Sequence, residues 1–192
     1  MDEPDPAVIR GAAAGDTASF EALVRHVQPH VWRFLRHLTG DADLAADLTQ
    51  ETLVRVHRGI GGFRFDCRFS TWVFRIARNA SVDEVRAAAR RRRLLDAVAA
   101  QPVARVGAGP GLATELRAAV TALPLRLREA FVLVEVFGLR YREAATVLGV
   151  PEGTVKSRVF HARRELVAWL RDGDDGEHGD GHGHDEQGHV GG

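Results

Sequence analysis

Residues 141–164 read YREAATVLGVPEGTVKSRVFHARR, and this stretch decides how the C-terminal part of the chain folds. Tyr141–Leu148 suits a short helix that Gly149 can end with a positive φ, and Pro151 fits the first turn of a second helix. Helical spacing turns Val155, Val159 and Leu166 inward and leaves these side chains outward: Thr154, Lys156, Ser157, Arg158, His161 and Arg164. Such a helix-turn-helix can enter the major groove of DNA. The alternative is an ordinary helical hairpin with a solvated face.

Charge is distributed unevenly along the chain. Its 192 residues are 45% hydrophobic, which suffices for one medium domain or two small ones, and the formal net charge is zero. Residues 172–192 hold seven acids and no Lys or Arg, which leaves 26 basic and 19 acidic residues over 1–171. This basic body, with a net charge of +7, favours an anionic partner, and nucleic acid comes first among the candidates.

The sequence has no feature that predicts export or membrane insertion. Cys67 is the single cysteine, so the chain cannot form an internal disulfide. The acidic N-terminus lacks the pattern of a signal peptide, and no apolar run approaches the roughly 20 residues of a membrane span. We therefore predict a cytoplasmic protein.

Helical periodicity dominates the chain, and strand signals are nearly absent. Before the helix-turn-helix, the pattern predicts five helices. The first begins at Asp16 or Thr17 as N-cap and ends at Gly40, and the others run from Asp41 to Gly59, from Ser70 or Thr71 towards Arg90–Arg93, over about Thr114–Leu123 and over about Leu125–Phe137. Residues 94–113 are rich in Ala, Val, Gly and Pro, which is typical of a flexible linker. The fold class is thus all-α, with two small helical domains at 1–93 and 114–171, the linker at 94–113 and a disordered Asp/Gly/His-rich tail at 172–192.

Aromatic residues and arginines alternate through residues 63–93, which contain nine arginines against three acids. Aromatic faces can stack on unpaired bases while arginines hold the strand, so the segment suits single-stranded nucleic acid. Trp72 fits a buried face better than a base-stacking position, whereas Phe63 and Phe65 lie in a glycine-flanked loop.

The helix that begins after Asp41 has a different surface. Asp43, Asp47 and Glu51 make its N-terminal half acidic, with Gln50 among them. Acids near a helix start stabilise it through the helix dipole, which is one explanation. The other is a docking surface for a basic protein partner, because phosphate would avoid this face.

Three motifs in this order resemble the extracytoplasmic-function (ECF) sigma factors of bacterial RNA polymerase. They are residues 41–53 (DADLAADLTQETL), residues 69–83 (FSTWVFRIARNASVD), and Ala122-Leu-Pro followed by residues 153–158 (GTVKSR). The resemblance covers about residues 12–171. It implies a region 2 domain over 1–93 that binds core RNA polymerase and the promoter −10 element, and a region 4 domain over 114–171 that binds the −35 element.

The resemblance also assigns roles to individual residues. For docking on core polymerase it implies Asp47, Gln50 and Glu51. For the melted −10 strand it implies Phe63, Phe65, Arg75, Arg78, Asn79, Ala80, Ser81 and Arg86, with residues 79–81 on a base-reading loop where a flipped base is bound. For the −35 duplex it implies Thr154, Lys156, Ser157, Arg158, Phe160, His161 and Arg164.

Two positions depart from the family pattern. Arg140 stands where a capping Ser or Thr is frequent, and His161 stands where arginine is frequent. Family members are commonly held inactive by an anti-sigma factor, so the resemblance implies such a partner beside core RNA polymerase and promoter DNA. It implies no cofactor and no enzymatic activity, since the chemistry belongs to the polymerase.

The tail leaves further interpretations open. His178, His182, His184 and His189 lie among seven carboxylates, and these ligand types suit zinc, nickel or copper. A metal-responsive sigma factor is therefore one alternative, beside a solvated low-complexity tail and a tail that screens the basic faces. A stand-alone helix-turn-helix transcriptional regulator is the other alternative, although it gives the aromatic and acidic surfaces no purpose.

Overall fold

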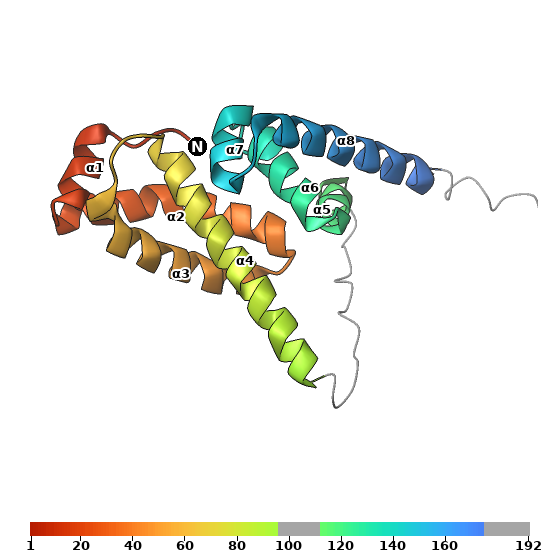
Figure 1. Ribbon diagram of the computed structural model, residues 1–192, viewed down its shortest axis with the longest axis horizontal. Coiled ribbons are helices and arrows are strands. Elements are labelled where there is room, and N and C mark those ends of the chain that lie inside the picture. Colours follow the sequence, from red (N-terminus) through yellow and green to blue (C-terminus); the bar gives the residue numbers. More distant parts are fainter. Residues whose placement is uncertain (96–111, 175–192) are drawn as a thin grey trace, which may run out of the picture.

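The computed structural model describes residues 1–95 and 112–174, and the side chains of 85–95, 112–115 and 172–174 lie outside this description. All regular structure in these residues is helical, as the sequence predicts. The chain forms two groups of helices that pack against each other, with α1 to α4 in one group and α5 to α8 in the other (Figure 1).

The first group begins with α1 (Pro6–Ala13), α2 (Thr17–Thr39) and α3 (Ala42–Gly59). Local signals place the boundaries of α2 and α3. Asp16 accepts from the backbone N–H of Ser19, Gly40 ends α2 in the left-handed conformation, and Asp41 caps α3. The predicted boundaries of both helices are therefore confirmed. Helix α1 was not predicted from the sequence, although Asp5 as N-cap and Pro6 at the first helical position signal its start.

The longest helix, α4 (Phe69–Leu95), crosses α2 and α3 and continues beyond them (Figure 1). A short 3-10 turn, η1 (Ile60–Gly62), and a loop at 63–68 connect α3 to α4. The helix begins at Phe69, slightly earlier than the predicted Ser70 or Thr71. It carries Phe74 and Ala77, both fully buried, into the core.

The second group contains α5 (Leu112–Ala122), α6 (Leu125–Phe131), η2 (Val132–Val136), α7 (Tyr141–Leu148) and α8 (Glu152–Asp174). The predicted helix over 125–137 is interrupted, because η2 is a π-helix. Widening of the turn changes the periodicity, so Val132 and Leu133 are completely buried while Phe131 and Val134 are half-buried.

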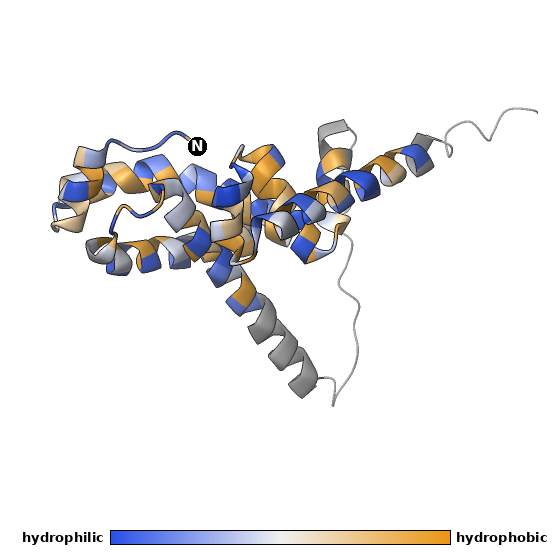
Figure 2. Cartoon of the chain, turned by 45° about the horizontal axis from the view of Figure 1, so that its top comes forward, coloured by the Kyte–Doolittle hydropathy of each residue, from blue (hydrophilic) through white to orange (hydrophobic). Residues whose placement is uncertain are grey.

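One continuous hydrophobic core joins the two groups. Phe34 of α2, Phe74 of α4 and Phe137 after η2 pack edge to face, with ring centroids 5.0 to 5.9 Å apart. Figure 2 shows hydrophilic and hydrophobic residues alternating along α8, in blue and orange. The sequence pattern predicts two separate helical domains, and the shared core is not visible in it.

Candidate nucleic-acid interface

The helix-turn-helix of α7 and α8 has the predicted geometry. Gly149 adopts φ 65° and ends α7, and the carbonyl of Pro151 accepts from the backbone N–H groups of Thr154 and Val155 at the start of α8. Ala144 and Val155 have no exposed surface, which lets the two helices pack closely. Arg140 does not cap α7 with its side chain. The Glu143 carboxylate instead accepts from the Arg140 backbone N–H at 2.8 Å, and so closes the first turn.

The outward face of α8 is accessible. Val155, Val159 and Leu166 are buried, as predicted. Of the residues that the sequence analysis assigned to duplex DNA, Thr154 and Arg158 are half-buried, and Lys156, Ser157, Phe160, His161 and Arg164 are exposed. Phe160 is 57% exposed although it is apolar, and such exposure on a cationic helix face suits contact with a partner.

Neighbouring groups orient the cations of α8. Lys156 lies 2.8 Å from Glu152 one turn earlier, and hydrogen bonding to that carboxylate raises the pKa of Lys156, which keeps it charged. The Arg164 guanidinium lies 5.9 Å from the centre of the Phe160 ring. Arg163 is held by Glu135 at 2.7 Å, so it is less available to a ligand.

The loop at 63–68 contains two phenylalanines in opposite environments. Phe63 is 8% exposed and packs against Phe69 and Trp72, so it supports the loop. The expectation that Phe63 offers a face to DNA is therefore wrong for this conformation. Phe65 is 46% exposed and has φ 58°, a left-handed conformation that is costly for a bulky residue. Strain of this kind collects at functional positions, so Phe65 remains a candidate.

Residues 79–81 lie within α4 and not on a loop, so that expectation is wrong. The helix continues because no Gly or Pro interrupts the sequence between Phe69 and Leu95. Ala80 and Ser81 are 2% and 3% exposed, which prevents contact with a base in this conformation. Arg75 and Asn79 are both exposed and, four residues apart, share one helix face.

Two further arginines were predicted to bind the melted strand, and the side chain of one of them is described. Arg78 donates to the Glu129 carboxylate of α6 at 2.8 Å, so it is engaged within the molecule. Arg86 lies on α4, but its side chain is outside the described part of the chain.

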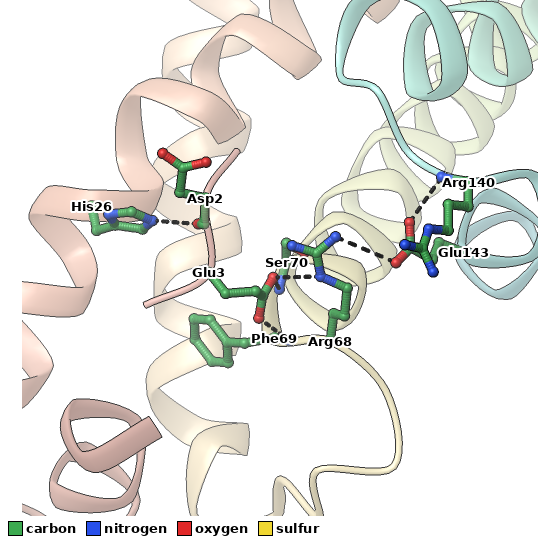
Figure 3. Close-up of polar contacts among 8 residues, drawn as sticks. All are labelled: Asp2, Glu3, His26, Arg68, Phe69, Ser70, Arg140 and Glu143. Atoms are coloured by element: carbon green, nitrogen blue, oxygen red, sulfur yellow. Dashed lines mark hydrogen bonds and ion pairs between the residues drawn. The ribbon is translucent and has the colours of Figure 1, made fainter. Parts of the chain in front are cut away.

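The N-terminus of α4 is capped from a distant part of the sequence. The Glu3 carboxylate accepts from the backbone N–H groups of Phe69 and Ser70 at 2.9 and 3.1 Å, as Figure 3 shows. Arg68 lies 3.4 Å from Glu3 and 3.4 Å from Glu143 of α7, and so connects the N-terminal segment to the helix-turn-helix. No local sequence signal predicted this role of Glu3, because its partners are more than 60 residues away.

A groove of about 520 Å³ separates α3 from α4. Its lining includes Asp47, Glu51, Asp83 and Glu84. Arg55 donates to Glu51 at 2.8 Å and to Asp83 at 3.1 Å, and these bonds, the one to Glu51 first, raise the pKa of Arg55. Gln50 is exposed on the same helix as the predicted docking residues Asp47 and Glu51. The groove is therefore predominantly acidic, which suits a basic protein surface better than DNA.

The described residues contain no group of three or more His, Cys, Asp or Glu side chains that could hold a metal ion. The four tail histidines, His178, His182, His184 and His189, lie outside the described part of the chain. None of the described helices has the length and hydropathy of a membrane-crossing segment.

Comparisons with known proteins identify both groups of helices. Residues 23–91 match the family model for Sigma-70 region 2, and residues 113–166 match the model for Sigma-70 region 4. The chain is 35% identical over 167 residues to the ECF RNA polymerase sigma factor SigM of Mycobacterium tuberculosis, a match that covers 86% of this chain and 84% of that protein.

Two solved structures are similar over both groups. The sigma factor RpoE of Bartonella quintana, in complex with the anti-sigma factor NepR, matches with a TM-score of 0.70 and 30% identity over 79% of this chain and 96% of that one. CnrH, in complex with the cytosolic domain of CnrY, matches with a TM-score of 0.66 and 27% identity over 88% of this chain and 97% of that one. The motifs, the fold and these relatives agree: the chain belongs to the ECF sigma factors of the sigma-70 family.

Proposed function

We propose that this chain is a promoter-specificity subunit that binds core RNA polymerase, recognises the −35 element as duplex and the −10 element as a melted strand, and so starts transcription of a specific set of genes. The acidic groove between α3 and α4 carries this proposal. A regulator that only binds duplex DNA has no use for such a surface, whereas a subunit of the polymerase needs one. The groove lies on the same group of helices as residues 63–93, in which aromatic residues and arginines alternate.

Contact with core polymerase is assigned to Asp47, Gln50 and Glu51, which are exposed along α3. Carboxylates at the rim of a groove attract basic side chains and fix their orientation. Arg55 and Asp83 hold the two sides of the groove together, because their ion pair of 3.1 Å joins α3 to α4.

Recognition of the −35 element is assigned to the outward face of α8. Residues near the N-terminus of a recognition helix contact base edges, and basic residues contact phosphates. Lys156, Ser157 and His161 are exposed and suit these roles, with Phe160 beside them. The set is completed by Thr154, Arg158 and Arg164 at its edges.

Binding of the −10 strand is assigned to Phe65, Arg75 and Asn79, which are exposed. An exposed ring can stack on an unpaired base, and an amide can read a base edge. Arg78 joins this set once it is released from Glu129, and Arg86 lies further along α4. Phe63 is buried and supports the loop. Ala80 and Ser81 are not assigned to strand binding, because they are buried as well.

The proposal includes a division of labour along the chain: polymerase and −10 binding by 1–93, a connection at 94–113 and −35 binding by 114–171. A cytoplasmic location and the absence of enzymatic activity follow from this role. An anti-sigma factor is a further expected partner, since a similar sigma factor is known in complex with the anti-sigma factor NepR.

In vitro transcription tests the proposal. Core polymerase with this protein on a genomic promoter library should give new transcript start sites that core polymerase alone does not give. If no new start appears, the proposal is refuted. Tight binding to duplex DNA without polymerase would instead favour a stand-alone regulator.

Two substitutions separate the promoter contacts. Asn79→Ala should change base preference at the −10 element and leave the −35 element unaffected, while Ser157→Ala should do the reverse. One good base contact is worth about 1–3 kcal/mol of discrimination. Sequencing of transcripts from randomised promoters gives both preferences, and an equal loss at both elements in either variant contradicts the assignment.

A further inference from the structure

Residues 1–13 hold the loop at 63–68 from both of its ends. Helix α1 packs against η1, which precedes the loop, and a Cβ at Gly61 would lie 3.6 Å from the carbonyl oxygen of Ala13. Ahead of α1, the Glu3 carboxylate accepts from the first two backbone N–H groups of α4, which follows the loop. We call residues 1–13 the N-terminal clasp, since they contact the chain on either side of this loop.

The extended residues before α1 are themselves fixed to the first group of helices. Pro4 is buried, and Met1 is half-buried against the hydrophobic core. The carbonyl oxygen of Asp2 lies 2.8 Å from Nε2 of His26 on α2 (Figure 3). The backbone of Glu3 is therefore held on both sides, so less conformational entropy is lost when its side chain caps α4.

Aromatic contacts connect the capped end of α4 to Phe65. The ring centroids of Phe69 and Phe63 lie 5.5 Å apart, and those of Phe63 and Phe65 lie 4.8 Å apart. Phe69 also donates its backbone N–H to Glu3. Phe69 and Phe63 are buried, whereas Phe65 is exposed. Two buried rings thus support the exposed ring that the proposed function assigns to the melted strand.

The backbone of Phe65 depends on this support. Its φ of 58° lies in the left-handed region, which a bulky residue adopts at a cost in free energy. Such a conformation persists only where the surrounding structure fixes it. Freed from these contacts, Phe65 would return to a negative φ, and its ring would leave the present position. The contacts at both ends of the loop therefore decide where the exposed ring points.

Glu3 is a positioning residue and not a contact for DNA, because a carboxylate repels phosphate. Its charge is balanced within the molecule by Arg68, 3.4 Å away, and by the positive end of α4. The surface around the loop therefore stays suited to an anionic strand although a carboxylate lies beside it.

The match to Sigma-70 region 2 begins at residue 23, so the family assignment gives the N-terminal clasp no role. We propose that the clasp is a positioning element of the −10 site: Glu3 fixes one end of the loop at 63–68 and thereby holds Phe65 where its ring stacks on an unpaired base. This inference rests on the proposed function. It adds to the −10 site a residue that is distant in the sequence from the ring it positions.

Binding of promoter fragments by the complex of this chain with core RNA polymerase tests the role of Glu3. The first fragment carries both elements of a promoter that the native chain uses, with the −10 non-template strand unpaired, and the second fragment ends upstream of the −10 element. Glu3→Ala should weaken binding of the first fragment by about fivefold or more, the scale of one lost base stack, and leave binding of the second unchanged. Native affinity of Glu3→Ala for the first fragment, or equal losses on both fragments, would overturn the proposal.

Asp16→Ala is the matched control. Asp16 also caps a helix with its carboxylate, but it accepts from Ser19 within α2 and not from the loop or α4. Its loss should cost similar stability and change binding of either fragment by less than about twofold. Glu3→Gln, which keeps an oxygen acceptor, should show a smaller loss than Glu3→Ala on the first fragment. It replaces Glu3→Ala if circular dichroism shows that variant to be unfolded.

A double-mutant cycle with Phe65→Ala shows whether Glu3 acts through this ring. If it does, Glu3→Ala should weaken binding of the first fragment no further once the ring is absent. Additive losses in the two variants would show that Glu3 acts independently of Phe65, which contradicts the proposal.

Cys67 reports on the loop without an added label, because it is the only cysteine of the chain. Its thiol is half-buried, and burial, followed by the charge of Asp66, raises its pKa, so its reaction with N-ethylmaleimide should be slow in the native chain. Mass spectrometry should show a rate about threefold or more higher in Glu3→Ala and an unchanged rate in Asp16→Ala. The same rate in Glu3→Ala and the native chain would show that the clasp does not fix the loop.

The two measurements distinguish this inference from the proposed function. If the native chain with core polymerase gives no transcripts, the proposed function fails, and the strand-binding role of the clasp fails with it. The reaction of Cys67 then still decides whether the clasp fixes the loop. If the native chain is active but Glu3→Ala binds the first fragment as tightly, only the positioning role is overturned.

Discussion

Replacing Arg128 by Met removes a buried cation and retains much of its apolar volume. Arg128 donates to three carbonyl groups, those of Leu38, Thr121 and Leu123. A hydrogen bond from a charged donor contributes at least about 1.5 kcal/mol, so the three together contribute about 4.5 kcal/mol. Burial opposes this gain: it lowers the pKa of Arg128, and the Nε atom is buried without a partner. That atom alone costs about 1–2 kcal/mol.

We therefore expect Arg128→Met to lower the free energy of unfolding by about 3 kcal/mol. For a chain of this size the melting temperature should fall by about 6–12 °C. Urea denaturation and calorimetry measure the two quantities. Arg126→Met is the matched control, because Arg126 is exposed on the same helix and its loss should cost less than about 0.5 kcal/mol. Equal stability of Arg128→Met and the native chain, or equal losses in the two variants, would refute this reasoning.

Three other predictions concern the loop at 63–68, the cap of α4 and a histidine of α2. Phe63→Ala should cost about 3–5 kcal/mol in urea denaturation because the ring is buried, whereas Phe65→Ala should cost less than about 1 kcal/mol and reduce transcript yield; the reverse order would contradict the roles assigned to them. Glu3→Gln should cost about 1 kcal/mol by weakening the cap of α4, and an unchanged urea midpoint would show that the cap is unimportant. Burial, followed by nearby arginines, lowers the pKa of His37, so the unfolded chain takes up this proton first as the pH falls through about 6.5. Stability should accordingly fall between about pH 7.5 and 5.5, and His37→Gln should reduce that loss in urea titrations, whereas an identical loss would exclude His37 as a source.

The candidate site was partly predictable from the sequence. The exposed face of α8 and the exposed acids of α3 follow from helical periodicity, which assigns each residue to a side of its own helix. Phe63 and Phe65 could not be told apart in this way, because they lie in a loop without periodicity. Residues 79–81 were misplaced because the family resemblance suggested a loop, while their own composition continues a helix.

The sequence by itself determined the helices and most of their ends. Asp16, Gly40, Asp41 and Gly149 act on backbone groups within a few residues, so their effect can be recognised without knowledge of the fold. Only the tertiary structure decided that the two groups of helices share a core, that Glu129 binds Arg78 across 51 positions, and that Glu3 caps α4 across 66. The physical reason is the sequence distance over which each interaction acts. A cap or a helical period depends on residues a few positions apart, whereas contacts between residues distant in the sequence depend on how whole helices pack.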